Sequence, residues 1–303
     1  MKLNGKSHGP GYDVFRAIFR NKLTVVCLII VFILVFVACT VDLFFDYDTD
    51  VIGQDMTALR QKPSAEHWFG TDDKGRDYFS RTVYATRVSI VISLSVNLSA
   101  AILATLLGGL AAYYGGWVDT IVMRVLDAFL AIPSTLMIIC IIATIGNTIP
   151  CLILGYTITS TPGLLRTARA AFMVSMQNEY VEAARASGTK EWKIIFGHLL
   201  PNSLGPIIVS VTMNIGSVII ATAALGYLGL GLKPPAPEWG RMLAEAQQYM
   251  RTDLYLLLIP GLCILITATV FNLLGDGIRD AMDPRLRGYI KPKWTPFWKR
   301  SKK

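Results

Sequence analysis

The sequence predicts an all-α protein that crosses a membrane six times, with both termini in the cytoplasm. Hydrophobic residues make up 53% of the 303 residues and charged residues only 17%, against about 25% charged residues in an ordinary soluble domain. Six apolar stretches have the length of about 20 residues that a bilayer-spanning helix needs. The last five of them contain no Asp, Glu, Lys, Arg or His, so lipid is the expected solvent of this chain.

The first element is a basic segment, residues 1–22, followed by an apolar stretch over residues 23–41. This order is also found in secretory signal peptides, but the apolar core of a cleaved signal is only about 7–15 residues long. We therefore expect an uncleaved membrane anchor. Residues 42–87 then form the first segment on the external side of the membrane.

Five further spans are expected over residues 88–113, 128–146, 148–165, 202–225 and 254–275, so that residues 88–275 form a five-helix core. With the N-terminus inside, 20 of the 29 Lys and Arg residues lie on the cytoplasmic side. Nine of those 20 belong to the basic tail, residues 276–303. An excess of Lys and Arg in cytoplasmic segments is the usual orientation signal, and it places both termini in the cytoplasm.

The sequence lacks the motifs that would give the chain a chemistry of its own. It has no phosphate-binding G-x-x-x-x-G-K-[S/T], no G-x-S-x-G and no H-E-x-x-H. Its three histidines lie in different segments and its five cysteines show no C-x-x-C spacing. We expect no catalytic residue, no bound cofactor and no metal, and no nucleic-acid partner, because no recognition module accompanies the basic charge.

Residues 70–77 contain acidic residues and glycines, as a calcium loop does, but with the wrong spacing. An EF-hand loop that begins at Asp73 requires Glu at its twelfth position, where this chain has Tyr84. One that begins at Asp72 places Lys74 at a ligand position. A tight, hydrogen-bonded turn is the expected structure.

The segment between the fourth and fifth spans, residues 178–201, predicts a helix, a break and a second short helix. Asn178 is expected to cap the first helix, and Glu179 and Glu182 lie near the positive end of its dipole. Small side chains follow at residues 183, 184 and 186, which let another protein approach closely. Gly188 ends the helix because glycine adopts positive φ readily. An apolar stripe then precedes Pro201.

This segment resembles the EAA loop of binding-protein-dependent ABC importer permeases, whose pattern is E-A-A, three residues, G, nine residues, I, one residue, L-P. His198 stands at the isoleucine position, as in the peptide-permease branch. The resemblance implies a type I ABC importer permease fold, with residues 179–201 as the loop that couples it to an ATPase. The matching residues are Glu182, Ala183, Ala184, Gly188, Leu200 and Pro201.

Three other stretches resemble the dipeptide, oligopeptide and nickel branch of that family. Residues 67–77 match H-x-[FL]-G-T-D-x-x-G-R-D, residues 226–240 match the stretch after the fifth span, and residues 276–285 match the branch's C-terminal end. The resemblance implies that the external segments contact a receptor protein or shape an outer gate. The residues expected there are Gly70, Thr71, Asp72, Gly75, Arg76, Asp77, Pro235, Glu238, Trp239 and Gly240.

The resemblance also implies partners in a prokaryotic cell membrane: a second homologous permease, two cytoplasmic ABC ATPases and an extracytoplasmic solute-binding protein. ATP and Mg²⁺ would be bound by the ATPases, because this chain has no P-loop. The substrate implied is a peptide, and nickel or a metal chelate is the alternative within the same machinery.

The sequence argues against two other classes of protein. A secondary transporter usually carries an ionisable residue within the membrane, and spans two to six have none; Arg124 and Asp127 are expected to pair at the membrane edge instead. A membrane-bound enzyme would need a triad or metal cluster.

Three tryptophans, Trp117, Trp192 and Trp239, are expected as interfacial anchors. Four further residues either face a polar channel or pack between helices: Met213, Asn214, Thr269 and Asn272.

Overall fold

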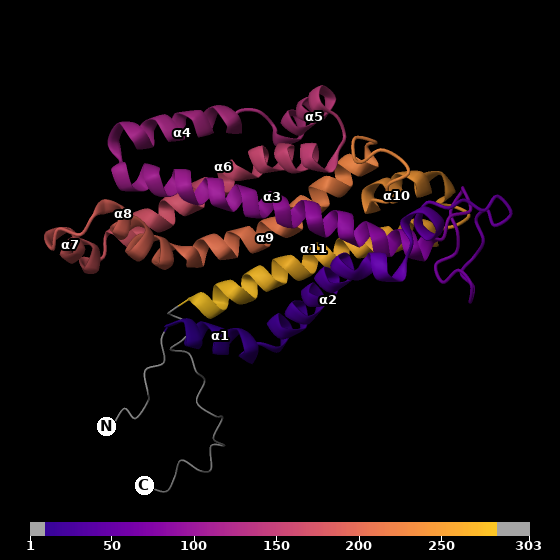
Figure 1. Cartoon of the computed structure of the whole chain (residues 1–303), viewed down its shortest axis with the longest axis horizontal. Helices are drawn as coiled ribbons and strands as arrows, with labels where there is room; N and C mark the ends of the chain where they lie inside the picture. The colour runs from indigo at the N-terminus through magenta and orange to yellow at the C-terminus, as the bar shows by residue number, and fades with distance from the viewer. Residues whose placement is uncertain (1–9, 284–303) are drawn as a thin grey trace, which may run out of the picture.

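The computed structural model describes residues 10–283, and their regular structure is helical. The helices form an elongated bundle (Figure 1). Their bounds are α1 Pro10–Arg20, α2 Lys22–Phe44, α3 Tyr78–Tyr114, α4 Gly116–Leu130, α5 Ser134–Ile145, α6 Ile149–Met176, α7 Glu179–Ala186, α8 Glu191–Lys193, α9 Leu200–Tyr227, α10 Trp239–Ala246 and α11 Tyr255–Met282. Short π-helical segments, Tyr47–Val51 and Ile194–Leu199, and a 3₁₀ turn, Gln247–Tyr249, complete the list.

Side-chain caps and glycines set the ends of the first long helices. The Asn21 side chain accepts a hydrogen bond from the amide of Leu23 and so caps α2. Asp77 caps α3 by accepting from the amide of Ser80 at 2.8 Å. Gly115, at φ +60°, lies between α3 and α4. These local signals explain why α3 begins ten residues before the predicted span at 88, since the capping aspartate lies at position 77.

Within residues 10–283, four helices are long and apolar enough to cross a membrane: α2, α3, α11, and the continuous helical stretch Glu191–Tyr227 that contains α9. A fifth candidate is the pair α4 and α5, which is bent by 82°. The predicted uninterrupted span over 128–146 is therefore wrong. Pro133 lies at the break, where its ring disfavours continuation of the preceding helix.

Helix α6 runs to Met176, well beyond the predicted end at residue 165, and it is not among the candidate spans. Its centre carries the polar run Tyr-Thr-Ile-Thr-Ser-Thr at residues 156–161, which lowers its mean hydropathy. The hydroxyls of Thr159 and Thr161 bond to backbone carbonyls one turn earlier, which satisfies them within the helix.

The residues predicted to connect the second and third spans, 114–127, instead form most of α4, which packs on α6. Arg169 of α6 holds Asp119 of α4 with two hydrogen bonds of 2.5 and 2.6 Å. Asp127 pairs with Arg166 at 2.8 Å and not with Arg124, so the expected local pair is wrong. The partner that the sequence could not indicate lies on the next long helix.

Close helix packing occurs between α3 and α6 and between α9 and α11. A Cβ added to Gly216 of α9 would lie 2.8 Å from the carbonyl oxygen of Ala268 in α11. The missing side chain therefore lets the two backbones approach closely, as small residues commonly do between membrane helices.

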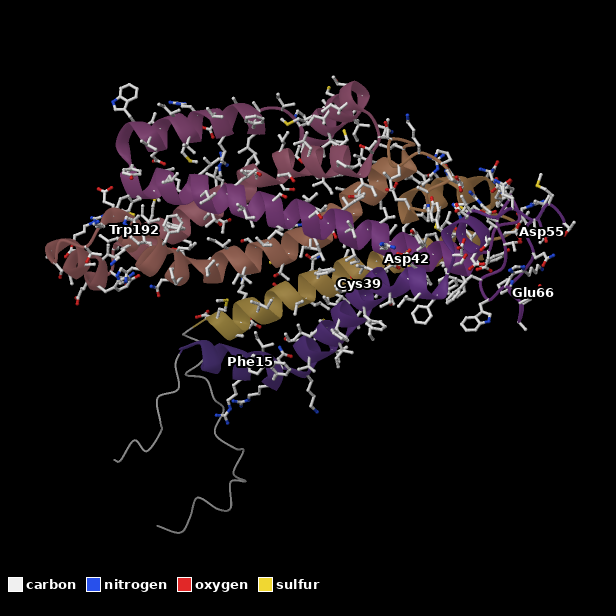
Figure 2. The ribbon with its side chains drawn as sticks, in the orientation of Figure 1. Phe15, Cys39, Asp42, Asp55, Glu66 and Trp192 are labelled. Carbon is white, nitrogen blue, oxygen red and sulfur yellow. The ribbon has the colours of Figure 1, made fainter. Side chains whose placement is uncertain are left out.

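Two structures occupy opposite ends of the bundle. Helices α7 and α8 lie at one end, and α10 lies with the irregular segment 45–77 at the other (Figure 1). Figure 2 likewise places Trp192 at the α7–α8 end and Asp55 and Glu66 at the far end. We call residues 45–77 together with 228–254 the cap. Helix α1 packs on α11, away from the cap.

Candidate functional site

Helices α7 and α8 are held on the bundle by a small apolar cluster. Val181 of α7 and Ile194 and Leu199 of the π-helical segment are at most 1% exposed. They pack with Phe172 near the end of α6 and Ile207 near the start of α9. Burial of each such side chain contributes about 1.5–3 kcal/mol, so this surface moves together with the ends of α6 and α9.

Gly188 forms the break between α7 and α8 as predicted, with φ +69°. The amide of Thr189 donates to the carbonyl of Ala184, and the amide of Gly188 donates to that of Arg185. These two bonds are the pattern of a Schellman C-cap. A Cβ at position 188 would meet nothing within 4 Å, so glycine is needed here for its backbone conformation and not for space.

Most of the residues of the EAA resemblance face outward. Glu182, Ala183, Gly188 and Pro201 are exposed, and Ala184 and Leu200 are half-buried. Glu182 has no ion-pair partner among the described residues. Bulky exposed apolar residues lie nearby along the chain, namely Trp192 at 58% and Phe196 at 53% exposure. Together they form a surface with a free negative charge and apolar side chains beside it.

The predicted N-cap of α7 is wrong in detail. Asn178 precedes the helix, but its side chain makes no capping bond. Its amide group instead donates to the carbonyls of Val174 and Ser175, at 3.3 and 2.9 Å. It therefore caps the C-terminal end of α6, whose last carbonyls lack helical partners.

The π-helical segment joins α8 to α9 without a break. The amide of Leu200 donates to the carbonyl of Ile195, five residues earlier. Pro201 follows and has no amide hydrogen, so the regular i to i−4 ladder cannot continue through it. The result is one helical stretch from Glu191 to Tyr227, so the surface formed by α7 and α8 is directly continuous with α9.

The cap at the opposite end is organised by a buried ion-pair network. Arg76 lies with Nε 2.6 Å from Oδ2 of Asp72 and Nη2 3.1 Å from Oε2 of Glu245. Arg81 of α3 lies 3.5 Å from the same Asp72 oxygen and donates to the carbonyl of Val51 at 3.1 Å. Both arginine side chains are 1% exposed. The network thus connects the loop before α3, α3 itself and α10.

Asp72, Asp73 and Glu245 bring three carboxylates within 4.8 Å of one another, as a metal site would. Burial, together with the charges of Asp72 and Glu245, raises the pKa of Asp73 above its ordinary value. Arg76 and Arg81 each contact two of the three carboxylates, so most of the negative charge is compensated within the chain. The cluster is an ion-pair network and gives no ground for a cation.

The stretch 238–240 attaches α10 to the rest of the bundle. Oε2 of Glu238 accepts the amide of Leu232 at 3.1 Å, and the indole of Trp239 donates to the carbonyl of Thr82 at 3.1 Å. A Cβ on Gly240 would collide with the backbone of Ala223 at the end of α9. Trp239 is 1% exposed, so its prediction as an interfacial anchor is wrong; Trp117 and Trp192 are exposed.

Most residues that the sequence assigned to an external receptor or gate are thus buried within the chain. Gly70, Thr71, Asp72, Gly75, Arg76, Glu238, Trp239 and Gly240 are buried, Asp77 is half-buried and pairs with His67 at 2.9 Å, and Pro235 is exposed. They fix the shape of the cap, whose exposed side chains include the neighbouring Trp68, at 65% exposure.

Sequence reasoning missed Arg81 and Glu245, which complete this network. Glu245 is 169 positions from Arg76, so no local spacing connects the two. One signal was present: Arg81 and Glu245 both lie in the segments predicted outside the membrane, where unpaired charges of opposite sign are natural partners.

Of the predicted C-terminal stretch, Asp276 to Asp283 are described and residues 284 and 285 lie outside the described residues.

The chain matches known families along most of its length. Residues 102–288 match the family described as binding-protein-dependent transport system inner membrane component. Residues 9–63 match the N-terminal TM domain of oligopeptide transport permease C.

Similar proteins carry peptide transporter names. The dipeptide transport system permease protein DppC of Alkalihalophilus pseudofirmus is 40% identical over 92% of this chain and 91% of its own length. The glutathione transport system permease protein GsiD of Pectobacterium atrosepticum is 38% identical over 92% of each chain. The probable D,D-dipeptide transport system permease protein DdpC of Escherichia coli is 39% identical over 88% of this chain and 89% of its own.

The fold also has a counterpart among solved structures. A chain of the MetNI methionine ABC transporter, solved in inward facing conformations, matches with a TM-score of 0.56 and 17% identity. The match covers 68% of this chain and 97% of that one. With an exposed EAA helix anchored to a spanning helix, and relatives of about 40% identity along almost the whole chain, this protein belongs to the binding-protein-dependent inner membrane components, the permease subunits of ABC importers.

Proposed function

We propose that this chain is one of two permease subunits of an ATP-driven peptide importer and forms half of its translocation pathway. The observation that carries the proposal is the exposed surface at Glu182 and Ala183 on α7, anchored through a buried cluster to the base of α9. Two cytoplasmic ABC ATPases would bind ATP and Mg²⁺, and an extracytoplasmic solute-binding protein would deliver the substrate.

The proposed topology places the cap outside the cell and α7, α8 and both termini in the cytoplasm. The excess of Lys and Arg on the segments at that side supports this orientation. The bent pair α4 and α5 would cross as one broken span and the more polar α6 as another, which gives six crossings. The sequence divisions at 22, 41, 87 and 275 would then be ends of spans. Helix α3 begins ten residues before the division at 87–88, and α11 ends seven residues after that at 275.

Coupling would pass through the continuous helix that joins α8 to α9. When the two ATPases close on ATP, each pulls on one permease surface formed by α7 and α8. Since Val181, Ile194 and Leu199 are buried against α6 and α9, a shift of α7 moves those spanning helices rather than sliding over them. Tilting of the spans would alternate access between the two sides of the membrane.

Peptide is the proposed substrate because the three relatives described above are named for dipeptides, glutathione and D,D-dipeptides. The matched domain of oligopeptide transport permease C supports the same class. No observation on this chain favours the alternative of nickel or a metal chelate.

The test is binding-protein-dependent ATP hydrolysis by the assembled importer in proteoliposomes. Glu182→Lys reverses an exposed charge on the proposed contact surface, and a like-charge contact across an interface costs several kcal/mol. We expect the variant to insert normally, since residue 182 lies outside the spans, but to lose at least tenfold of the stimulation by peptide-loaded binding protein. Lys233→Glu reverses a charge in the cap, on the opposite side, and should leave unchanged both the attachment of the ATPases and their basal hydrolysis, which do not depend on the binding protein. Full stimulation of the Glu182→Lys complex would rule out α7 as the coupling element.

A further inference from the structure

A groove of about 320 Å³ opens where α6, α9 and α11 meet, and its lining differs from the apolar surface around it. Its walls carry hydroxyl and amide side chains and no ionisable group. Met213, Asn214 and Asn272, for which the sequence left a channel role open, all line it, whereas Thr269 does not. The full lining is Ser160, Gly163, Leu164, Thr167, Ser210, Met213, Asn214, Ser217 and Asn272.

Most of these polar groups have hydrogen-bonding capacity to spare. The amide of Asn214 donates to Oδ1 of Asn97 at 2.8 Å, and Asn97, 1% exposed, donates to the carbonyl of Ser93. Oδ1 of Asn214 accepts from no described residue. The side chains of Ser160, Ser210, Ser217 and Asn272 make no hydrogen bond among the described residues. In hydrocarbon each such group is costly, so the groove must face water, solute or a polar protein surface.

The polar wall is held in place by close packing behind it. The amide of Asn272 lies against Gly216, where a Cβ would come within 3.3 Å of its nitrogen. Met213 packs against Gly275 of α11 in the same way. With Asn214 fixed through buried Asn97, the two asparagine amides have set positions, as a binding surface requires.

The dimensions and chemistry of the groove fit a short peptide main chain. Ser210 and Ser217 are two helical turns apart, which spans about 10 Å at 1.5 Å per residue. An extended peptide rises about 3.3 Å per residue, so two or three residues cover this length. Hydroxyls and carboxamides both donate and accept, which suits the N–H and C=O groups that every peptide shares. Because the lining of the groove carries no charged residue, it favours neither acidic nor basic side chains of the peptide.

We propose that this groove is the part of the translocation pathway that binds the peptide backbone, with Asn214, Ser217 and Asn272 as its principal contacts. The proposal rests on the proposed function, in which a second permease supplies the facing wall. Selectivity for peptide side chains is then left to the solute-binding protein, and this chain recognises amide groups.

A charge placed in the groove tests the assignment. The complete importer is reconstituted in proteoliposomes with binding protein saturated either with Ala-Glu or with Ala-Lys, and the ratio of their uptake rates is measured. Ser217→Asp should lower uptake of Ala-Glu relative to Ala-Lys by about tenfold, because like charges repel in a site of low dielectric. Stimulation of ATP hydrolysis by loaded binding protein is measured on the same preparation, as the check that the complex is assembled and coupled. Because the ratio is taken on one preparation, a lower yield of complex does not affect it.

Thr212→Asp is the matched control. Thr212 lies on the same helix, but it lines a different groove, apolar and between α3 and α9, so the ratio should not change. If Ser217→Asp does not assemble, the isosteric Asn272→Asp provides the same readout. An unchanged ratio with ATP hydrolysis still coupled, as expected if a partner helix fills the groove, would overturn the assignment, as would an equal change in the control. Wild-type importer that takes up neither peptide would instead contradict the proposed function.

Discussion

Arg76 and Glu245 are 169 positions apart in the sequence, yet Nη2 of the arginine lies 3.1 Å from Oε2 of the glutamate. The pair connects the loop that precedes α3 to α10. Since Arg76 also holds Asp72 at 2.6 Å, one buried guanidinium organises two separate segments of the cap. The loop sequence of residues 67–77 thus has a physical role in shaping the cap, whether or not any of these residues touches a partner.

Replacing Arg76 by Leu should destabilise the cap. The substitution leaves the carboxylate of Asp72, 7% exposed, without its main partner, and loss of one member of a buried ion pair costs about 3–5 kcal/mol. Hydrogen exchange of the purified complex should show faster exchange in residues 70–81 and 238–246.

The control for this change is Arg60→Leu. Arg60 is 45% exposed and lies 3.7 Å from Asp253, so its loss should cost less than about 1 kcal/mol. Equal exchange in the Arg76 and Arg60 variants would mean that the buried network does not hold the cap together.

The stability of the cap should depend on pH through Glu238. Burial raises the pKa of this carboxyl from 4.5 to about 7, against the lowering effects of the Leu232 amide and Arg241; the hydroxyl of Tyr156, from α6, also interacts with it. Because the folded state holds the proton more tightly, the contribution of Glu238 to stability is complete below pH 4.5 and is lost as the pH rises to about 7. At 1.36 kcal/mol for each pKa unit the loss is about 3 kcal/mol.

Glu238→Gln removes the titrating group and should flatten this dependence. Hydrogen exchange of residues 226–246 is compared at pH 5 and pH 8, after correction for the intrinsic exchange rate. The exposed Glu66→Gln change in the same cap should behave like the wild type. A Glu238→Gln complex that keeps the wild-type pH dependence would assign it to another group.

Substitutions at Gly188 should separate backbone strain from bulk. Since a Cβ would meet nothing there, Gly188→Ala should cost only the strain of a left-handed residue, about 1–2 kcal/mol, and Gly188→Val should cost more. Gly188→Asn should recover most of the loss, because asparagine tolerates this conformation. The measurement is stimulation of ATP hydrolysis by loaded binding protein.

Gly197→Ala is the control for position 188, because residue 197 has open space around it and no positive φ. It should retain coupling. If Gly188→Ala and Gly197→Ala behave alike, the Schellman turn is not what positions α7.

Cysteine labelling should establish the proposed orientation. The side chains of Lys62, Lys233 and Lys190 are all exposed. A cysteine at 62 or 233 should react with a membrane-impermeant reagent only from outside, and one at 190 only from inside. Lys293, a further inside position, lies outside the described residues. Labelling of position 190 in intact cells would reverse the orientation.

The long apolar stretches of the sequence determined the helices, Gly188 determined the turn after α7, and the E-A-A motif indicated the family. Bilayer-length stretches without charge have few alternatives to a helix, because the backbone must satisfy its own hydrogen bonds in lipid. The turn at Gly188 and the E-A-A motif depend only on residues close together in the sequence, so their spacing is enough to predict them. The break before α5 was indicated by Pro133, but the apolar residues on both sides of it, within 128–146, favoured one continuous span.

Only the tertiary structure decided which polar side chains meet. Asp127 pairs with Arg166 and not with its helical neighbour, Arg76 with Glu245, and Asn97 with Asn214 across 117 positions. The same holds for the groove, whose serines and asparagines come from three helices. Such contacts depend on the rotation and crossing of packed helices, set by glycines such as Gly216 where two backbones touch. A one-dimensional pattern gives the face on which a residue lies, but not the helix that faces it.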